Sequence, residues 1–428
     1  MNDGRPERAS DGPGVAMSRR AVLHGLAMAA VSLFLAGCRA ASGTASPSAT
    51  PLASATAVPS APSSQPTPTP PSRSATPSPT PSPGLSLETR VAGLIVVGFR
   101  GSRLDQATWV RTALARTGLG GVILFDRDQE SGGRRNVVSA AQLRTLVGEL
   151  RAAAGDRQII VSIDQEGGVV TRLSPAHGFR AVASEADIGD IDDAGKARSW
   201  GEDIAETLAS VGIDLNFAPV VDLDVNPKSP AIGALDRSFS ADPDVVVAMA
   251  TAEIAAHRAA GIRTTLKHFP GIGSSTTNTD FGVADVTKTW TRRELEPFQR
   301  LIDAGTVDLI MAGHVVNGQL DPDHPASLSA ATVNGLLRDE MGWSGPVVTD
   351  DLQAAAIDQA FGFDEAVVLA LEAGNDLLLF ANQQGYDPKI VSRAIGAVVA
   401  AVESGRLPAA RIDEAWQRVK GFNAGRGG

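Results

Sequence analysis

Residues 159–166 read Ile-Ile-Val-Ser-Ile-Asp-Gln-Glu. A short apolar run that ends in carboxylates is typical of a strand buried on both faces of a parallel sheet. Runs of this kind recur along the chain and are separated by stretches with helical spacing. The predicted strands are residues 94–97, 121–125, 159–164, 214–218, 264–268, 309–313, 346–350 and 376–380.

The segments between these strands predict a helix after most of them. Amphipathic spacing indicates helices at residues 194–211, 244–260, 292–304, 329–341, 364–373 and 389–404. Alternation of eight strands with helices predicts an α/β fold, a (β/α)8 barrel with one catalytic domain. A doubly wound open sheet is the alternative. No Gly-x-Gly-x-x-Gly run follows an early strand, which disfavours a dinucleotide-binding version of that sheet.

Composition narrows the function classes. The 428 residues include 38 Lys and Arg against 48 Asp and Glu, a net charge of −10. This acidic balance argues against a nucleic-acid-binding protein, which presents a clustered basic face. A single cysteine excludes an intramolecular disulfide and a cysteine-based zinc site. The sequence contains no metal-binding constellation, and we expect neither a metal nor a cofactor.

The N-terminal segment predicts export. Arg19 and Arg20 precede an apolar stretch, residues 21–37, and residues 18–23 also resemble a twin-arginine signal. Small residues then lead to Cys38, the only cysteine, as in a bacterial lipobox. We therefore predict that residues 1–37 are a lipoprotein signal peptide and that Cys38 is lipidated. This would anchor the protein to the outer face of the bacterial cell membrane.

Two alternatives remain open at this end of the chain. The apolar stretch could be an uncleaved transmembrane anchor, although about 17 residues is short for a span. Translation could also start at Met17 rather than Met1. Residues 38–84 consist almost entirely of Ala, Ser, Thr, Pro and Gly. Such a segment buries too little apolar surface to fold, so we predict a disordered tether followed by a folded domain at residues 85–428.

Polar residues gather where the predicted strands end. They are Asp164-Gln165-Glu166, Asn216, Lys267-His268, His314 and Asp350-Asp351. Barrels of this class place their active sites at the carboxyl ends of the strands. Any one of these aspartates could instead cap the next helix. Their recurrence on five strands predicts a shared site.

The motifs around these residues resemble glycoside hydrolase family 3. The similarity rests on Asp164-Gln165-Glu166-Gly167-Gly168 with Arg172, on residues 216–222, on Asp236-Arg237-Ser238-Phe239, on residues 267–273 and on Val348-Thr349-Asp350-Asp351-Leu352. It covers residues 88–425 and is strongest to the single-domain β-N-acetylglucosaminidases that act on cell-wall fragments. It implies a retaining hydrolase of β-glycosides and therefore a carbohydrate substrate. A family-related β-glucosidase or phosphorylase is the alternative activity.

The resemblance also implies a role for each site residue. Asp350 occupies the position of the carboxylate that attacks the anomeric carbon. Asp351 is the runner-up, but neighbouring residues of a strand point to opposite faces, so only one should enter the barrel mouth. The sugar-binding side chains implied by the match are Asp164, Arg172, Arg237, Lys267 and His268. Each of these could instead belong to a structural ion pair.

Two further residues have open assignments. His314 follows Met311 as in a family motif, and it could line the pocket or partner a buried carboxylate. Asp376 is expected to order the eighth strand rather than to contact substrate. The remaining histidines, His177, His257 and His324, have no partner motif and are expected to lie at the surface.

The sequence departs from the family pattern at the general acid/base. The glucosaminidase branch carries Asp-x-His in the loop after the fifth strand, whereas this chain has Asn278-Thr279-Asp280. Ile272 also stands where the family has a second histidine. Asp280 could itself be the acid/base, oriented by Asn278, with Asp285 as a weaker candidate. Catalysis could instead be slow, or the barrel could be a non-catalytic glycan-binding module.

Overall fold

The computed structural model describes residues 84–424. The predicted signal peptide, Cys38 and the predicted tether up to residue 83 lie outside the described residues. The domain that follows is built around one parallel sheet and extensive buried apolar side chains.

Parallel strands form the centre of the domain. In the described part of the chain the eight-stranded sheet has the order β12-β9-β7-β6-β3-β2-β1-β13. A parallel bridge between Val348 and Leu377 joins its two ends. The sheet therefore closes into a barrel, and the predicted (β/α)8 fold is confirmed. The strands are β1 (Ile95–Gly98), β2 (Gly121–Leu124), β3 (Ile160–Ile163), β6 (Leu215–Asn216), β7 (Arg263–Phe269), β9 (Leu309–Ala312), β12 (Val347–Thr349) and β13 (Leu378–Phe380).

All eight predicted strands coincide with barrel strands, and several of them are the continuous apolar runs that burial of both faces requires. Short additional strands lie in the loops that follow the barrel strands. β4 (Gln165–Gly167) pairs with β5 (Val170–Thr171), and β10 (Val315–Asn317) pairs with both β8 (Ala284–Asp285) and β11 (Asp321–Pro325).

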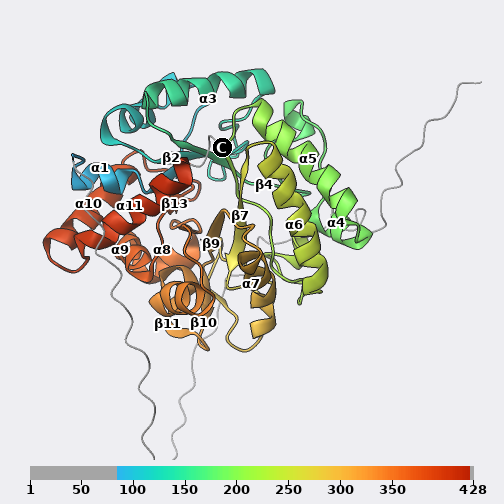
Figure 1. The fold of residues 1–428 in the computed structure, drawn as a ribbon. Helices are drawn as coiled ribbons and strands as arrows, with labels where there is room; N and C mark the ends of the chain where they lie inside the picture. The colour runs from blue at the N-terminus through green and yellow to red at the C-terminus, as the bar shows by residue number, and fades with distance from the viewer. Residues whose placement is uncertain (1–83, 425–428) are drawn as a thin grey trace, which may run out of the picture. The chain divides into compact units, whose positions relative to one another are not determined.

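Helices surround the barrel, with α3 across the top of the view in Figure 1, α4–α6 at the right and α9–α11 at the left. Residues 331–340, inside a predicted helix, form a π-helix. The sequence interpretation named no helix at α3 or α11. The bounds are α1 (Leu87–Ala92), α2 (Thr108–Thr112), α3 (Ala140–Ala154), α4 (Glu185–Ile191), α5 (Ala194–Ser210), α6 (Pro243–Ala259), α7 (Glu296–Asp303), α8 (Ala355–Phe361), α9 (Phe363–Ala373), α10 (Ile390–Glu403) and α11 (Ala409–Ala424).

Asp376 shows how the amino-terminal ends of the strands are held. This fully buried carboxylate accepts hydrogen bonds from Arg338 at 2.7 Å, Arg411 at 3.0 Å and Arg418 at 3.2 Å. It also accepts from the backbone amide of Val347. It therefore ties β12 to helices outside the barrel and plays the structural role expected of it.

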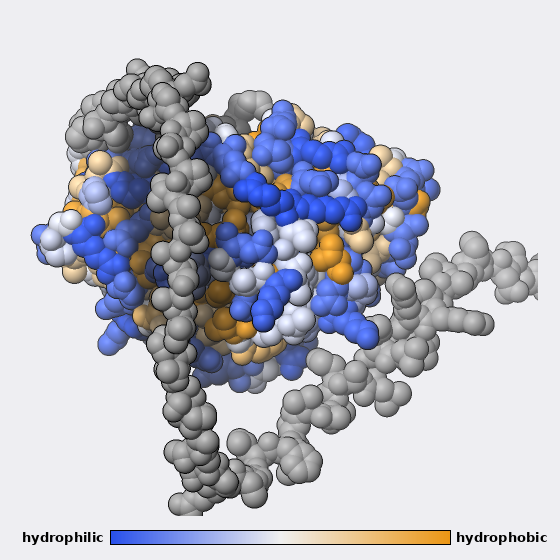
Figure 2. Space-filling view, turned by 90° about the horizontal axis from the view of Figure 1, so that it is seen from below, coloured by the Kyte–Doolittle hydropathy of each residue, from blue (hydrophilic) through white to orange (hydrophobic). Residues whose placement is uncertain are grey.

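On the visible face in Figure 2, hydrophilic residues predominate and hydrophobic ones form small groups.

Candidate active site

A cavity of about 190 Å³ opens at the carboxyl ends of the barrel strands. Most of the predicted site residues border it, although they come from four barrel strands, β3, β6, β7 and β12, and the loops that follow them. Those lining the cavity are Asp164, Arg172, Arg237, Lys267, His268, Asp280 and Asp350. The barrel topology therefore brings together most of the side chains that the sequence analysis assigned to one site.

A buried ion network forms one wall of the cavity. Glu166, at 1% exposure, accepts two hydrogen bonds from Arg237, at 2.7 and 2.8 Å. Lys267 Nζ lies 2.5 Å from Glu166 Oε1 and 3.1 Å from Asp164 Oδ1. Burial alone would raise the pKa of Glu166, but the two cations lower it, so this carboxylate is ionised. Glu166 therefore fixes both cations in place.

Asp164 is the more open of the two carboxylates. Its side chain is 17% exposed, compared with 2% for that of Glu166. Arg172 Nη2 approaches its second oxygen at 3.6 Å. Lys267 and Arg172 thus flank a carboxylate that faces the cavity, where hydroxyl groups of a ligand could bind both charges.

His268 is held by the loop after β6. Its Nδ1 lies 2.7 Å from Asp222 Oδ2, and the same oxygen accepts the His268 backbone amide at 3.0 Å. The other Asp222 oxygen accepts the backbone amide of Ile272 at 2.8 Å. Ile272, which replaces a family histidine, thus contributes its backbone to the arrangement and its side chain to the cavity wall.

Asp350 follows β12 and accepts the backbone amide of Asp351 at 2.8 Å. Burial opposes ionisation, but His314, His268, the Asp351 amide and Lys267 together lower the pKa of Asp350. Burial lowers the pKa of His314 as well, so that ring is neutral near pH 7. His268, the amide and the Lys267 ammonium are then the groups that favour the Asp350 anion.

Asp351 also borders the cavity, contrary to the expected alternation, because β12 ends at Thr349 and the strand geometry ends with it. Its carboxylate accepts the backbone amides of Ala381 at 2.9 Å and Gln353 at 3.2 Å. Burial, together with the neighbouring Asp350 and Asp280, raises the pKa of Asp351 to about 7. These contacts bind the loops after β12 and β13 together and occupy one oxygen of Asp351.

Asp280 lies in the loop after β7. Its backbone amide donates to Asn278 Oδ1 at 2.9 Å, so Asn278 shapes the turn through the backbone rather than through the carboxylate. Burial and then the nearby Asp350 charge raise the pKa of Asp280. Asp285, the weaker candidate, is exposed and its pKa is lowered by hydrogen bonds from Thr287. Asp280 therefore has the raised pKa that a general acid requires, and Asp285 does not.

His314 is not among the residues that border the cavity. Its Nε2 lies 2.7 Å from the Asp351 carbonyl and its Nδ1 lies 2.6 Å from Ser327 Oγ. A carbonyl only accepts, so Nε2 donates to it. Both ring nitrogens are thus used within the protein, so His314 has a structural position, although its partners are a hydroxyl and a backbone carbonyl rather than the expected carboxylate.

His257 corrects a sequence expectation. It is fully buried rather than at the surface, and its Nε2 lies 3.1 Å from Asn216 Nδ2. Its Nδ1 lies 3.0 Å from the Glu253 carbonyl, one helical turn earlier in α6. Its ring faces the barrel because α6 packs this side inward. The apolar spacing of the helix was the available signal.

The roles of Glu166 and Asp222 were missed, although both lie inside quoted motifs. Both are buried carboxylates that hold a site cation or imidazole, and neither has sequence spacing that reveals its partner. In the described residues 84–424, no group of three His, Cys, Asp or Glu side chains could hold a metal ion. Within the same range, no helix is long and apolar enough to cross a membrane.

Comparison with known proteins identifies the family. The model for the glycosyl hydrolase family 3 N-terminal domain matches residues 86–421. The chain belongs to glycosyl hydrolase family 3. Among its relatives in this family is a beta-hexosaminidase from Tolumonas auensis, 35% identical over 303 residues, which cover 68% of this chain and 84% of the relative.

Solved structures of family 3 enzymes have the same fold. A β-N-acetylglucosaminidase from Paenibacillus sp. matches with a TM-score of 0.73 and 34% identity, over 80% of this chain and 63% of that one. A β-N-acetylhexosaminidase from Beutenbergia cavernae matches with a TM-score of 0.72 and 33% identity, over 80% of this chain and all of that one. This family 3 protein is a glycosidase, and its substrate is a carbohydrate.

Proposed function

We propose that this glycosidase is a retaining β-N-acetylglucosaminidase in which Asp350 is the nucleophile and Asp280 the general acid/base. One observation carries the proposal. Two carboxyl groups border the same cavity, and their surroundings shift their pKa values in opposite directions, down for Asp350 and up for Asp280. A retaining glycosidase requires one ionised and one protonated carboxyl group.

The first step forms a covalent intermediate. Asp350 attacks C1 of the terminal sugar and forms an ester, the bond from C1 to the leaving oxygen breaks, and Asp280 gives its proton to that oxygen. Asp164, Lys267 and His268 would hold hydroxyl groups of the same sugar. Arg172 and Arg237 surround them, and charged groups make the stronger hydrogen bonds.

The second step reverses the roles. Water attacks C1, Asp280 accepts a proton from that water, and the ester bond to Asp350 breaks. The charge of Asp350 raises the pKa of Asp280 in the free enzyme. Ester formation removes that charge, so the pKa of Asp280 falls and the group becomes a base when one is needed. The change follows from the coupling between the two carboxyl groups.

The substrate class rests on the relatives. The Tolumonas protein is named a beta-hexosaminidase and the Paenibacillus structure is that of a β-N-acetylglucosaminidase. We propose that this chain removes β-linked N-acetylglucosamine from the non-reducing end of cell-wall glycan fragments. The N-terminal sequence supports an exported lipoprotein anchored through Cys38, which would place the enzyme beside its substrate in peptidoglycan turnover.

The test of the activity is turnover of p-nitrophenyl N-acetyl-β-glucosaminide compared with the β-glucoside, with the first-formed anomer followed by NMR. We expect turnover of the first compound with the β-anomer released first. Binding without turnover would identify a glycan-binding barrel, and sugar 1-phosphate formed in added phosphate would identify a phosphorylase. Either result would overturn the proposal.

The anchor has a separate test. In a bacterial host that processes lipoproteins, the wild-type protein should sediment with membranes. The Cys38→Ala variant should move to the soluble fraction if cleavage occurs, or stay uncleaved with an altered mass. Wild-type protein that carries no lipid by mass spectrometry would contradict the lipoprotein assignment and leave the enzymatic proposal intact.

A further inference from the structure

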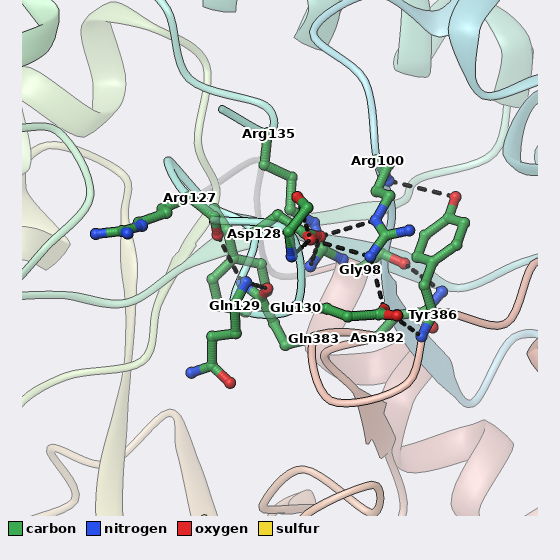
Figure 3. Close-up of polar contacts among 12 residues, drawn as sticks. Gly98, Arg100, Arg127, Asp128, Gln129, Glu130, Arg135, Asn382, Gln383 and Tyr386 are labelled. Carbon is green, nitrogen blue, oxygen red and sulfur yellow. Dashed lines mark hydrogen bonds and ion pairs between the residues drawn. The ribbon is translucent and has the colours of Figure 1, made fainter. Parts of the chain in front are cut away.

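Three neighbouring loops of the barrel mouth, those after β13, β1 and β2, are joined by polar contacts (Figure 3). Arg100, after β1, donates two hydrogen bonds to Asp128 at 2.9 and 3.0 Å and one to Glu130 at 2.7 Å. Its guanidinium lies 4.2 Å from the ring centre of Tyr386, in the loop after β13. Glu130 also accepts the Tyr386 backbone amide. The ion cluster therefore belongs to all three loops.

Gln383 makes a second connection across the same rim. Its Oε1 accepts the backbone amide of Gln129 at 2.9 Å, and its Nε2 donates to the Arg127 carbonyl at 3.0 Å. The side chain is 5% exposed, and both its amide oxygen and its amide nitrogen bind the loop after β2. Gln353 binds the Asn382 amide and the Gly385 carbonyl from the other side. The rim is thus braced from two directions.

The same loops carry two further side-chain amides, those of Gln129 and Gln384, which do not bind a neighbouring loop. Gln129 and Gln384 both border the active-site cavity and both are exposed. Neither side-chain amide has a hydrogen bond within residues 84–424. In Figure 3 the side chain of Gln129 points away from the ion cluster and carries no dashed contact. The loops are fixed, and these two amides are left for a ligand.

Depth separates these amides from the sugar-binding groups described above. Lys267 and His268 are 2% and 5% exposed and lie at the base of the cavity, whereas Gln129 and Gln384 lie at its mouth. In the closed strand order, β13, β1 and β2 stand across the barrel from β7, which precedes Asp280. Asp280 and the two amides thus border the same cavity from loops that follow opposite strands of the barrel.

We propose that Gln129 and Gln384 form a leaving-group subsite that recognises the hydroxyl and acetamido groups of a second sugar unit. This inference rests on the proposed function, because it assigns the part of the substrate beyond the cleaved bond. A carboxamide offers one acceptor and two donor hydrogens, which suits hydroxyl and acetamido groups. The charged side chains of the rim, Arg100, Asp128 and Glu130, are already paired with one another, so the two carboxamides are the groups that remain for these contacts.

The test compares two substrates, p-nitrophenyl N-acetyl-β-glucosaminide and N,N′-diacetylchitobiose, whose first sugar is the same. For Gln129→Ala and Gln384→Ala, the ratio of kcat/KM for the disaccharide to that for the aryl glycoside should fall roughly 3- to 10-fold each. The double variant should lower the ratio further. Gln158→Ala, at an exposed glutamine before β3, is the matched control and should leave the ratio unchanged.

A ratio that stays at the wild-type value in the double variant overturns the subsite. Failure of the proposed function gives a different result, because the wild-type protein would then turn over neither substrate. In that case, calorimetric titration with the disaccharide and with N-acetylglucosamine still tests the subsite. Weaker disaccharide binding in the double variant, with monosaccharide binding retained, would support it, and equal losses for both sugars would overturn it.

Discussion

Asp222 fixes the ring of His268 in a single orientation, because its Oδ2 lies 2.7 Å from Nδ1 and also accepts the His268 backbone amide. A carboxylate only accepts hydrogen bonds, so Nδ1 carries the proton. Its Nε2 lies 3.5 Å from Arg237 Nη2, a group that can only donate, so Nε2 is oriented as the acceptor. His268 is therefore prepared to accept a hydrogen bond from a sugar hydroxyl.

Replacing Asp222 with asparagine should disturb this arrangement. The variant loses the negative charge that accepts three hydrogen bonds, and its amide could donate to Nδ1 and reverse the tautomer. We expect kcat/KM for the aryl N-acetylglucosaminide to fall roughly 10- to 100-fold, since hydrogen bonds to charged groups are the strong ones. Thermal unfolding separates a positioning effect from collapse. An unchanged kcat/KM in a folded variant would show that His268 needs no such support.

Asp350→Ala should abolish turnover while the protein stays folded. The variant lacks the oxygen that bonds to C1. The neighbouring Asp351 is a poor substitute, because one of its oxygens binds the Ala381 and Gln353 amides and its pKa is raised to about 7. In the wild type, an activated fluorinated N-acetylglucosaminyl probe should add one sugar mass to the peptide that contains residue 350. Labelling at any other residue would remove Asp350 from its proposed role.

Asp280→Ala should affect substrates according to their leaving groups. A poor leaving group needs the proton, so turnover of a disaccharide should fall about 10²- to 10⁴-fold. A good aryl leaving group needs it less, and kcat/KM for such a substrate should fall far less. Added azide attacks the ester without a general base and should restore turnover with a β-glycosyl azide as product. Asp285→Ala is the matched control. A larger loss of turnover in this variant than in Asp280→Ala would identify Asp285 as the general acid/base.

The pH profile of the wild type should follow the two carboxyl groups. Asp350 must be ionised, and its pKa lies below the ordinary value, so activity persists into acid and is lost only as pH falls through that pKa. Asp280 must be protonated, and its pKa lies above the ordinary value, so activity is lost as pH rises through it. The alkaline limb should disappear from kcat/KM in Asp280→Ala. A limb that persists there would assign it to another group.

Sequence patterns predicted the barrel because buried parallel strands demand continuous apolar runs, and residues 95–97 and 309–312 meet that demand over their whole length. They also predicted which side chains would meet, since the carboxyl ends of parallel strands share one rim. The same reasoning failed just beyond a strand. Asp351 was expected to turn away from the barrel mouth, but it follows the end of β12 and borders the cavity.

Hydrogen bonds between residues that lie far apart in the sequence could not be predicted either. Nothing in the spacing of Glu166 and Arg237 reveals their two hydrogen bonds, which depend on how the loop after β6 returns to β4. His257 was misplaced for a related reason. A polar residue on a helix looks like a surface residue unless its buried partner is known, and here that partner is Asn216 on another element.

Glu294 gives a prediction about stability. It is 1% exposed and packs under the active-site loop, where a Cβ on Gly271 would lie 2.7 Å from the Glu294 Cβ. Burial, followed by the nearby Asp222 charge, raises the pKa of Glu294 from 4.5 to about 7. The folded state therefore binds a proton more tightly than the unfolded state. Stability conferred by this proton is complete below pH 4.5 and is lost as pH rises to about 7.

Glu294→Gln removes this titration because glutamine carries no charge at either pH. Relative to the wild type, the variant should gain up to about 3 kcal/mol of unfolding free energy between pH 4.5 and pH 8, the equivalent of the pKa shift. Denaturant unfolding at both pH values measures the difference. Glu206→Gln, at an exposed position of α5, should change by less than about 0.5 kcal/mol at either pH. If the two variants respond to pH alike, Glu294 is ionised in the folded protein throughout this range and its carboxylate is stabilised by contacts with the loop above it.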